Sequence, residues 1–330
     1  MHRSHQPFML FLVLILAVLL VNGCSPKNNP IRIAISVWAG VEPAELAAQL
    51  GYYEKHGVDV KIVRFSTYSD SLEALRDGNV DAGMHTLDDS LRNMSMGKDV
   101  RVVLLTDYSF GGDGLVARAG IETLLDLRGS RIGVEIGTVG HLSVLKILEK
   151  TGININDVTL VSIPAWEIQQ AMLDGKIDAG VTWEPYLTST AKMIGGNILI
   201  TSRDYPETII TTMTFDADVV ESRPEDVGKI VSAYFDAVEY IKQHPQEAFK
   251  IMGQAEGISA EDFSSHVDGL KYLDLQNNVE LYGTESNGRI FTTAKEISQF
   301  LADNQVIKNL PDVNQMLDSH FILNLYNDIH

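Results

Sequence analysis

One phrase occurs twice in this chain, about a hundred residues apart. Arg76–Thr86 reads RDGNVDAGMHT, and Leu173–Trp183 reads LDGKIDAGVTW. The second glycine-aspartate pattern follows the first with an offset of 97 residues, and the two phrases diverge after the shared Asp-Ala-Gly. A repeat of this period is far longer than a solenoid unit and indicates two similar domains.

The segments around the two phrases also correspond. In each half a β-branched strand pattern is followed by a helix, a second strand, a second helix and a short third strand. Arg32 and Arg131 occupy matching places in the first strands, and Gly57 and Gly152 stand where a helix ends on a residue with positive φ. The expected elements are residues 31–37, 42–57, 58–65, 69–78 and 80–83 in the first half, and residues 130–137, 140–152, 156–163, 165–175 and 177–180 in the second.

This β-α-β-α-β order predicts the fold class α/β, with two Rossmann-like lobes built on parallel sheets. The strands of a parallel sheet end at the same edge, and ligands bind just beyond that edge. Two such lobes, placed edge to edge, enclose a ligand cleft. The shared phrase then serves as scaffold, a helix end followed by a strand, and the divergent residues after it reach the cleft.

The first 23 residues have the pattern of a signal peptide. A short basic stretch at Arg3 precedes an unbroken apolar run that is too short for a membrane span. Val21–Cys24 reads VNGC, which resembles the lipobox of bacterial lipoproteins. Cys24 is the single cysteine of the chain, so it forms no internal disulfide. We expect residues 1–23 to be removed and residues 24–30 to form a lipidated tether at the extracytoplasmic face of a bacterial membrane.

The composition argues against several classes of function. The net charge is −18 and becomes −19 when Arg3 is removed with the signal peptide, which disfavours nucleic acid and bare anionic lipid as partners. The sequence has no nucleophile elbow, phosphate-binding loop or dinucleotide fingerprint, and its nine histidines show no metal-ligand spacing. We therefore expect no metal, no cofactor and no enzymatic activity.

Four segments, in this order and spacing, carry a resemblance to a known family. They read LGYYEKHGVDV, LRDGNVDAG, DLRGSRIGVEIGTVGHLSVLKILEKTGI and AMLDGKIDAGVTWEPY. Over residues 31 to about 254 the chain resembles the type II periplasmic solute-binding proteins of ABC importers, in the nitrate, sulfonate and taurine branch. The resemblance implies a monomeric binder that closes by a hinge motion around a small solute and delivers it to a permease.

The resemblance also implies that the two lobes are not sequential. Lobe 1 is expected to take residues 31–115 and 212–330, and lobe 2 residues 116–211. The chain returns to lobe 1 through a strand-like segment at residues 208–220, and amphipathic helices follow it.

Three residues of GTVGH are candidates for binding an anionic group. Gly137, Thr138 and His141 follow an expected strand and open a helix, where backbone amides and the helix dipole favour anions. The resemblance implies the same role, because this place often contacts the anionic head of the ligand in the family. The alternative is that the glycines only permit a tight turn and that His141 packs.

Two tryptophans at strand ends are candidates for lining the cleft. Trp38 follows the first strand, and Trp183 lies in the divergent tail of the second phrase. Each is suited to cover an apolar part of a ligand, and core filling is the alternative. We expect Trp166 to pack in the core and Glu184 to cap a helix or brace the hinge.

Polar candidates in the first lobe are Ser66, Tyr68 and Thr86, whose hydroxyl groups are suited to donate to ligand oxygens. Thr67 shares this role, and Ser69 or Asp70 is expected as a helix N-cap. Asp88 and Asp89 are expected in the first turn of a helix.

Asp113 is a candidate because it lies near the expected hinge. If carboxylates face the cleft, the ligand carries a positive group, as an aminosulfonate zwitterion does.

These observations together predict an extracytoplasmic, lipid-anchored solute-binding protein for a small organic anion or zwitterion, of the sulfonate, taurine or nitrate kind, that serves an ABC importer. The alternatives left open are a ligand-sensing lipoprotein that docks on a membrane signalling receptor, a binder of a cationic or pyrimidine-type cofactor precursor, and an enzyme on the same fold.

Overall fold

The computed structural model describes residues 29–284 and 287–329. The expected signal peptide at residues 1–23 and Cys24 lie outside the described residues. Within the described part of the chain, no helix combines the length and the apolar character that crossing a membrane requires.

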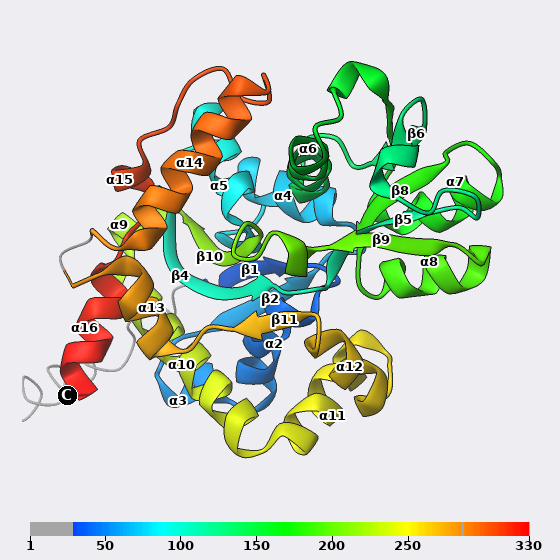
Figure 1. Cartoon of the computed structure of the whole chain (residues 1–330). Coiled ribbons are helices and arrows are strands. Elements are labelled where there is room, and N and C mark those ends of the chain that lie inside the picture. The colour runs from blue at the N-terminus through cyan, green and yellow to red at the C-terminus, as the bar shows by residue number, and fades with distance from the viewer. Residues whose placement is uncertain (1–28, 285–286, 330) are drawn as a thin grey trace, which may run out of the picture. The chain divides into compact units, whose positions relative to one another are not determined.

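Lobe 1 is built on a six-stranded sheet (Figure 1). Its strand order is β11-β4-β10-β3-β1-β2. The bounds are β1 Ile31–Ile35, β2 Val60–Arg64, β3 Ala82–Thr86, β4 Val100–Ser109, β10 Ile210–Asp216 and β11 Leu270–Tyr272. Strands β1, β2 and β3 run parallel, whereas β10 runs antiparallel to both β3 and β4.

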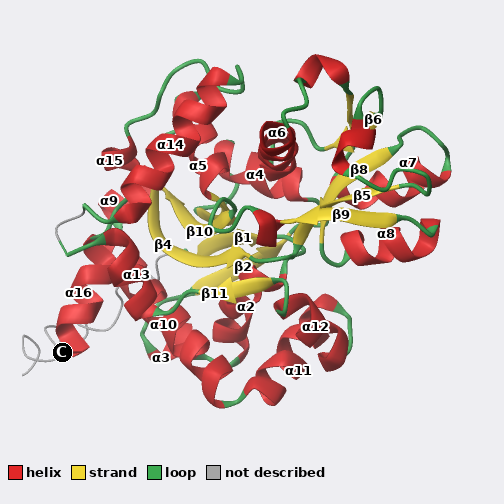
Figure 2. Cartoon of the chain, in the orientation of Figure 1, coloured by secondary structure: helices red, strands yellow, loops and turns green. Residues whose placement is uncertain are grey.

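Lobe 2 is built on a five-stranded sheet with the order β7-β6-β8-β5-β9. The bounds are β5 Asp113–Ala117, β6 Arg131–Val134, β7 Thr159–Ser162, β8 Ala179–Trp183 and β9 Asn197–Thr201. Strand β6 is parallel to β7 and β8, and β5 is antiparallel to β8 and β9. Both sheets have helices on their two faces, as Figure 2 shows, which confirms the α/β class and the two lobes.

The helices lie between these strands and beyond the last long one. Their bounds are α2 Glu42–Gln49, α3 Tyr52–Lys55, α4 Tyr68–Arg76, α5 Leu87–Ser95, α6 Val139–Thr151, α7 Ile168–Leu173, α8 Tyr186–Ile194, α9 Ala217–Ser222, α10 Pro224–Gln243, α11 Pro245–Glu256, α12 Ala260–Val267, α13 Leu275–Tyr282, α14 Arg289–Asp303, α15 Val313–Met316 and α16 His320–Ile329.

The repeated phrase has the same structural role in both lobes. In lobe 1, Asp81 accepts hydrogen bonds from the backbone N (2.8 Å) and Nε (2.9 Å) of Arg32. In lobe 2, Asp178 accepts from the same two atoms of Arg131, at 2.9 and 3.0 Å. Each pair sets the register between the first and third strand of its lobe, since Ile33 pairs with Ala82 and Ile132 with Ala179.

The glycine of Asp-Ala-Gly is required by the close approach of a neighbouring side chain rather than by its φ. A Cβ atom on Gly180 would lie 2.3 Å from the side chain of Ile168 at the start of α7. A Cβ atom on Gly83 would lie 2.2 Å from the ring of His85. No side chain fits at either position without displacing its neighbour.

Three expectations about element bounds need correction. The third strands cover residues 82–86 and 179–183 rather than 80–83 and 177–180, so the divergent residues belong to the strands themselves. The helix expected over residues 42–57 is two helices, because Gly51 has a φ of 70°. The N-cap of α4 is Thr67, whose side chain accepts from the amide of Asp70, and Ser69 lies inside the helix.

The chain crosses between the sheets twice, at residues 110–112 and 202–209. The predicted lobe boundaries, 115/116 and 211/212, fall inside β5 and β10. The crossings are tied together, since the hydroxyl of Ser202 lies 2.7 Å from that of Ser109 and accepts from the amide of Gly111 at 2.6 Å. Gly269 supplies one carbonyl oxygen to the amides of Phe110 and Gly112, both at 2.8 Å.

We expect Asp178→Ala to destabilise the protein by about 2 kcal/mol, because it leaves the amide and guanidinium of Arg131 without their charged acceptor. Asp174→Ala is the control, since Asp174 is an exposed carboxylate four residues earlier, and it should change stability by less than about 0.5 kcal/mol. Urea unfolding at pH 7 measures both values. Equal losses in the two variants would contradict a scaffold role for Asp178.

Candidate functional site

A small cavity lies where the strand ends of the two lobes meet. Its volume is about 30 Å³, enough for one or two water molecules. Parallel strands contribute their carboxyl ends, and the antiparallel strands β5 and β10 contribute their first residues, because they run the opposite way. The lining residues are Ser36, Val37, Trp38, Val41, Tyr68, Met84, Thr86, Asp113, Val139, Trp183, Ile209 and Thr211.

Two tryptophans, one from each lobe, are fixed by hydrogen bonds from their indole nitrogens. The indole Nε1 of Trp183, at the end of β8, donates to the backbone oxygen of Val37 in lobe 1 at 3.2 Å. The indole Nε1 of Trp38 donates to Asp107 Oδ1 at 3.0 Å. The ring of Tyr68 meets that of Trp183 edge-on, with centroids 5.6 Å apart. The cavity is therefore walled by aromatic side chains whose polar atoms are already bonded.

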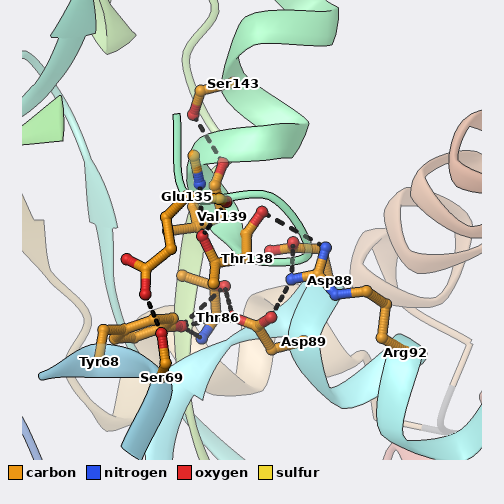
Figure 3. A network of polar contacts seen from close by, with 11 residues as sticks. Tyr68, Ser69, Thr86, Asp88, Asp89, Arg92, Glu135, Thr138, Val139 and Ser143 are labelled. Carbon is orange, nitrogen blue, oxygen red and sulfur yellow. Dashed lines mark hydrogen bonds and ion pairs between the residues drawn. The ribbon is translucent and has the colours of Figure 1, made fainter. Parts of the chain in front are cut away.

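The hydroxyl of Tyr68 belongs to a buried network (Figure 3). It donates to Asp89 Oδ2 at 2.5 Å and accepts from the amide of Thr86 at 3.0 Å. Thr86 Oγ1 also donates to Asp89 Oδ2, at 2.8 Å. Burial raises the pKa of Tyr68 well above its ordinary value, so the phenol stays neutral. These contacts fix both side chains at the edge of the cavity.

Arg92 on α5 neutralises the carboxylates beneath this network. Its Nη2 lies 3.0 Å from Asp88 Oδ2 and also pairs with Asp89 (Figure 3). Its Nη1 donates to the backbone oxygen of Thr138 in lobe 2 at 3.4 Å. Asp88 and Asp89 do lie in the first turn of α5, as expected, but they are buried and form an ion cluster with Arg92.

Asp107 and Asp113 are buried carboxyl groups without a cation beside them. Asp107 accepts from Trp38, Thr106 and Thr211. Burial raises the pKa of Asp107 to about 6 and that of Asp113 to about 7. Asp113 lines the cavity, and the charges of Asp107, Asp88 and Glu184 also raise its pKa. Lysine, arginine and histidine are absent from the described residues that line the cavity.

The structure brings five of the nine predicted binding residues to the cavity and leaves four away from it. The five are Trp38, Tyr68, Thr86, Asp113 and Trp183. Ser66 is exposed beyond β2 and lines no part of the cavity. Gly137, Thr138 and His141 do not line it either, although Val139 from the same helix does.

The geometry of α6 explains the place of these last residues. Successive residues of a helix are rotated by about 100°, so His141 points away from the side on which Val139 meets the cavity. Burial, followed by the charge of Arg92, lowers the pKa of His141, which disfavours a charged imidazole. Thr138 uses its hydroxyl to cap α6, donating to Glu135 O at 2.8 Å and accepting from Gly140 N at 3.3 Å.

Gly137 and Thr138 instead line a separate groove between the lobes, with a volume of about 390 Å³. Asp89 and Arg92 lie on its lobe 1 side. Gly137 and Thr138, directly before α6, thus face this groove, whereas Val139, the first residue of α6, faces the aromatic cavity.

Two other expectations concern residues beside the site. Trp166 was expected to pack, but 49 % of it is exposed, and it lies in a short 3-10 helix, residues 165–167, directly before α7. Glu184 does act as a cap, since its Oε2 accepts from the amide of Thr188 in α8 at 3.2 Å.

Sequence reasoning missed Ser36, Asp107, Thr211 and Glu135. The repeat relates two of these residues to each other. The offset of 99 residues between Arg32 and Arg131 also relates Ser36 to Glu135, and both residues follow the first strand of their lobe. Asp107 carries no such signal, because it meets Trp38 from a strand 69 residues away.

The site offers hydrogen-bonding groups and aromatic surface to a ligand. Its hydroxyl groups accept or donate within fixed networks, and its aromatic rings offer flat apolar surface. Among residues 29–284 and 287–329, no group of three or more histidine, cysteine, aspartate or glutamate side chains is placed to hold a metal ion.

Comparison with curated proteins finds relatives of two kinds. The chain is 24 % identical over 315 residues to a putative aliphatic sulfonates-binding protein of Bacillus subtilis, covering 91 % of this chain and 90 % of that protein. It is 28 % identical over 224 residues to a 4-amino-5-hydroxymethyl-2-methylpyrimidine phosphate synthase of Saccharomyces cerevisiae, covering 63 % of this chain and 65 % of the synthase.

Solved structures share the fold. The alkanesulfonate-binding protein of Xanthomonas axonopodis pv. citri, solved with MOPS bound, superposes with a TM-score of 0.74 at 16 % identity, over 89 % of this chain and all of that one. A family profile described as NMT1/THI5-like matches residues 40–248. The chain therefore belongs to the NMT1/THI5-like family, and its fold is that of the periplasmic solute-binding proteins.

Proposed function

We propose that this protein is a solute-binding component of an ABC importer, which captures a small solute between its lobes by hinge closure and presents it to the membrane permease. The observation that carries the proposal is the aromatic cavity between the lobes, with its single buried carboxyl group. The sulfonate-binding relative and the solved alkanesulfonate-binding protein support the class of function.

The size of the cavity supports a closure mechanism. A volume of about 30 Å³ is far below the several hundred Å³ of a pocket that holds an organic ligand. A solute therefore enters only when the lobes separate. The two crossings at residues 110–112 and 202–209 are the segments that bend in such a motion.

The charge of the cavity favours a solute with a positive or hydrogen-donating group. Asp113 is the one carboxyl group in its lining, and no cation in that lining neutralises it. A plain sulfonate or nitrate ion would face this carboxyl without a positive partner. A zwitterion such as an aminosulfonate places its ammonium group at Asp113 and leaves its anionic end to hydroxyl and amide donors.

A planar amino-heterocycle of the pyrimidine type is the second candidate. Trp38, Tyr68 and Trp183 offer ring surfaces from both lobes, and Asp113 is placed to accept from an exocyclic amine. The similarity to the yeast pyrimidine phosphate synthase favours this candidate over other cations. We propose binding rather than catalysis for this site, because the sulfonate-binding relative covers more of this chain than the synthase does.

The cellular context is part of the proposal. We infer from VNGC at residues 21–24 that Cys24 carries the lipid and that the mature chain works outside the cytoplasm as a tethered monomer. A signalling receptor that senses closure would use the same motion, and binding of the closed form to a permease distinguishes the two partners.

A thermal-shift screen tests the ligand class. The full-length chain is heated with an aminosulfonate, the alkanesulfonate of equal length, the corresponding alkylamine, nitrate and an aminopyrimidine. We expect the zwitterion or the aminopyrimidine to stabilise the protein, by about 2.7 kcal/mol when present at 100 times its dissociation constant. Stabilisation by the alkanesulfonate or nitrate alone would contradict the role of Asp113.

Asp113→Asn is expected to weaken binding of the amine-bearing solute by about 10- to 100-fold, because a hydrogen bond to a charged group is lost. Glu184→Gln is the matched control, since Glu184 is a nearby carboxylate that caps α8 and does not line the cavity. Calorimetric titration of both variants measures the effect. Unchanged affinity in Asp113→Asn would place the solute elsewhere.

The pH dependence of stability gives an independent test. Burial raises the pKa of Asp113 from 3.8 to about 7, so the folded protein holds a proton that the unfolded chain releases. The contribution of Asp113 to stability is therefore greatest below about pH 4 and is lost as the pH rises to 7. We expect the difference in unfolding free energy between wild type and Asp113→Asn to fall across this window, measured by urea unfolding. A constant difference would show that Asp113 is ionised throughout.

A further inference from the structure

Glu135 contacts both lobes although it belongs to only one. It follows β6 of lobe 2 and is 8 % exposed. Its Oε1 accepts a hydrogen bond from the hydroxyl of Ser69, on α4 of lobe 1, and Figure 3 shows the two side chains meeting across the gap between the lobes. Its Oε2 accepts from the amide of Ala165 in lobe 2 at 3.4 Å. The carboxyl group is thus a bridge that exists only when the lobes are together.

The surroundings of Glu135 are acidic on the side of lobe 1. Asp70 on α4 and Asp89 on α5 raise its pKa by their charge. Asp88 and Arg92 lie beside Asp89, and Arg92 pairs with both carboxylates.

On its own lobe, His141 of α6 is a titratable group six residues further along the chain, and burial, followed by the charge of Arg92, lowers its pKa. Closing the lobes therefore brings Glu135 toward carboxylates whose charge is already shared with one arginine.

We propose that Glu135 is a proton-sensitive latch: closure of the lobes draws a proton onto its carboxyl group, and loss of that proton favours opening. The inference rests on the hinge closure in the proposed function but not on the identity of the solute. It gives the protein a way to couple capture or release to the acidity outside the cytoplasm.

The physical argument concerns two states of the same carboxyl group. In the closed state burial, and then the charges of Asp89 and Asp70, raise the pKa of Glu135 from 4.5 to about 6, against the hydrogen bond from Ala165, which lowers it. When the lobes part, Glu135 loses Ser69 and the lobe 1 carboxylates and gains water, so its pKa returns toward the ordinary value. The closed state then binds the proton more tightly than the open state, and closure strengthens as the pH falls through 6.

The size of the effect follows from these two values. With a pKa of about 6 when closed and 4.5 when open, lowering the pH from 7.5 to 5 raises the closed-to-open ratio about eightfold. Asp113 and Asp88, whose pKa values are raised to about 7 and 6, face the same region and add their own dependence. The contribution of Glu135 to the pH dependence of closure is therefore measured as the difference between wild type and Glu135→Gln.

The experiment measures lobe separation in the full-length chain without any solute. Spin labels are attached at Asn79→Cys in lobe 1 and Asn156→Cys in lobe 2, both exposed, after Cys24→Ser removes the single native cysteine. Pulsed electron resonance then gives the closed and open fractions between pH 5 and 7.5. Glu135→Gln imitates the protonated latch and keeps an acceptor for Ser69. Glu149→Gln, an exposed glutamate on α6, is the control.

We expect Glu135→Gln to be more closed than wild type at pH 7.5. Between pH 7.5 and 5 its closed-to-open ratio should rise about eightfold less than that of wild type, while the ratio of Glu149→Gln should follow wild type. Ser69→Ala should open the lobes at every pH, because it removes the lobe 1 donor. Identical curves for wild type and Glu135→Gln would overturn the latch, and so would a Glu135→Gln protein that is more open. If a solute closes the lobes but the pH curves of wild type and Glu135→Gln coincide, only this inference is overturned, whereas Glu135-dependent closure with pH in a protein that no solute closes overturns only the proposed function.

Discussion

An aspartate at the start of the third strand of each lobe is the constraint on which the site depends. Asp81 and Asp178 each bind the amide and the guanidinium of an arginine in the first strand, which fixes the register of two parallel strands. The register decides where both strands end, and the strand ends supply the cavity. The repeated phrase therefore meets the same requirement, the register of the first and third strands, once in each lobe.

The two antiparallel strands bring polar residues to the cavity that the repeated phrase does not supply. Strands β5 and β10 run antiparallel to their neighbours, so their first residues, Asp113 and Thr211, lie at the edge where the parallel strands end. A carboxyl group thus enters a cavity whose other lining side chains are aromatic, aliphatic or hydroxyl-bearing. Polar contacts also join the two lobes, from Trp183 to Val37 beside the cavity and from Ser69 to Glu135 outside its lining. In our proposals these contacts form when the lobes close.

The sequence predicts the fold and about half of the site, for reasons that lie in particular residues. Periodicity and a constant offset suffice for the strands and helices. Trp38, Thr86 and Trp183 are predicted at the cavity because they stand at or just after strand ends, and Tyr68 because it opens the helix after β2. His141 does not line the cavity, and sequence alone does not indicate this, because the face of a helix that meets a cavity depends on how the lobes pack. Asp107 and Glu135 escape prediction because their partners, Trp38 and Ser69, are 69 and 66 residues away.

The measurement that tests the account most directly is a crystal structure of the chain with an amine-bearing solute that stabilises it. The account predicts the solute between Trp38 and Trp183, in a cavity enlarged by lobe movement, with its amino group within hydrogen-bonding distance of Asp113. A solute bound outside this cavity, or one whose anionic group lies against Asp113, would contradict it.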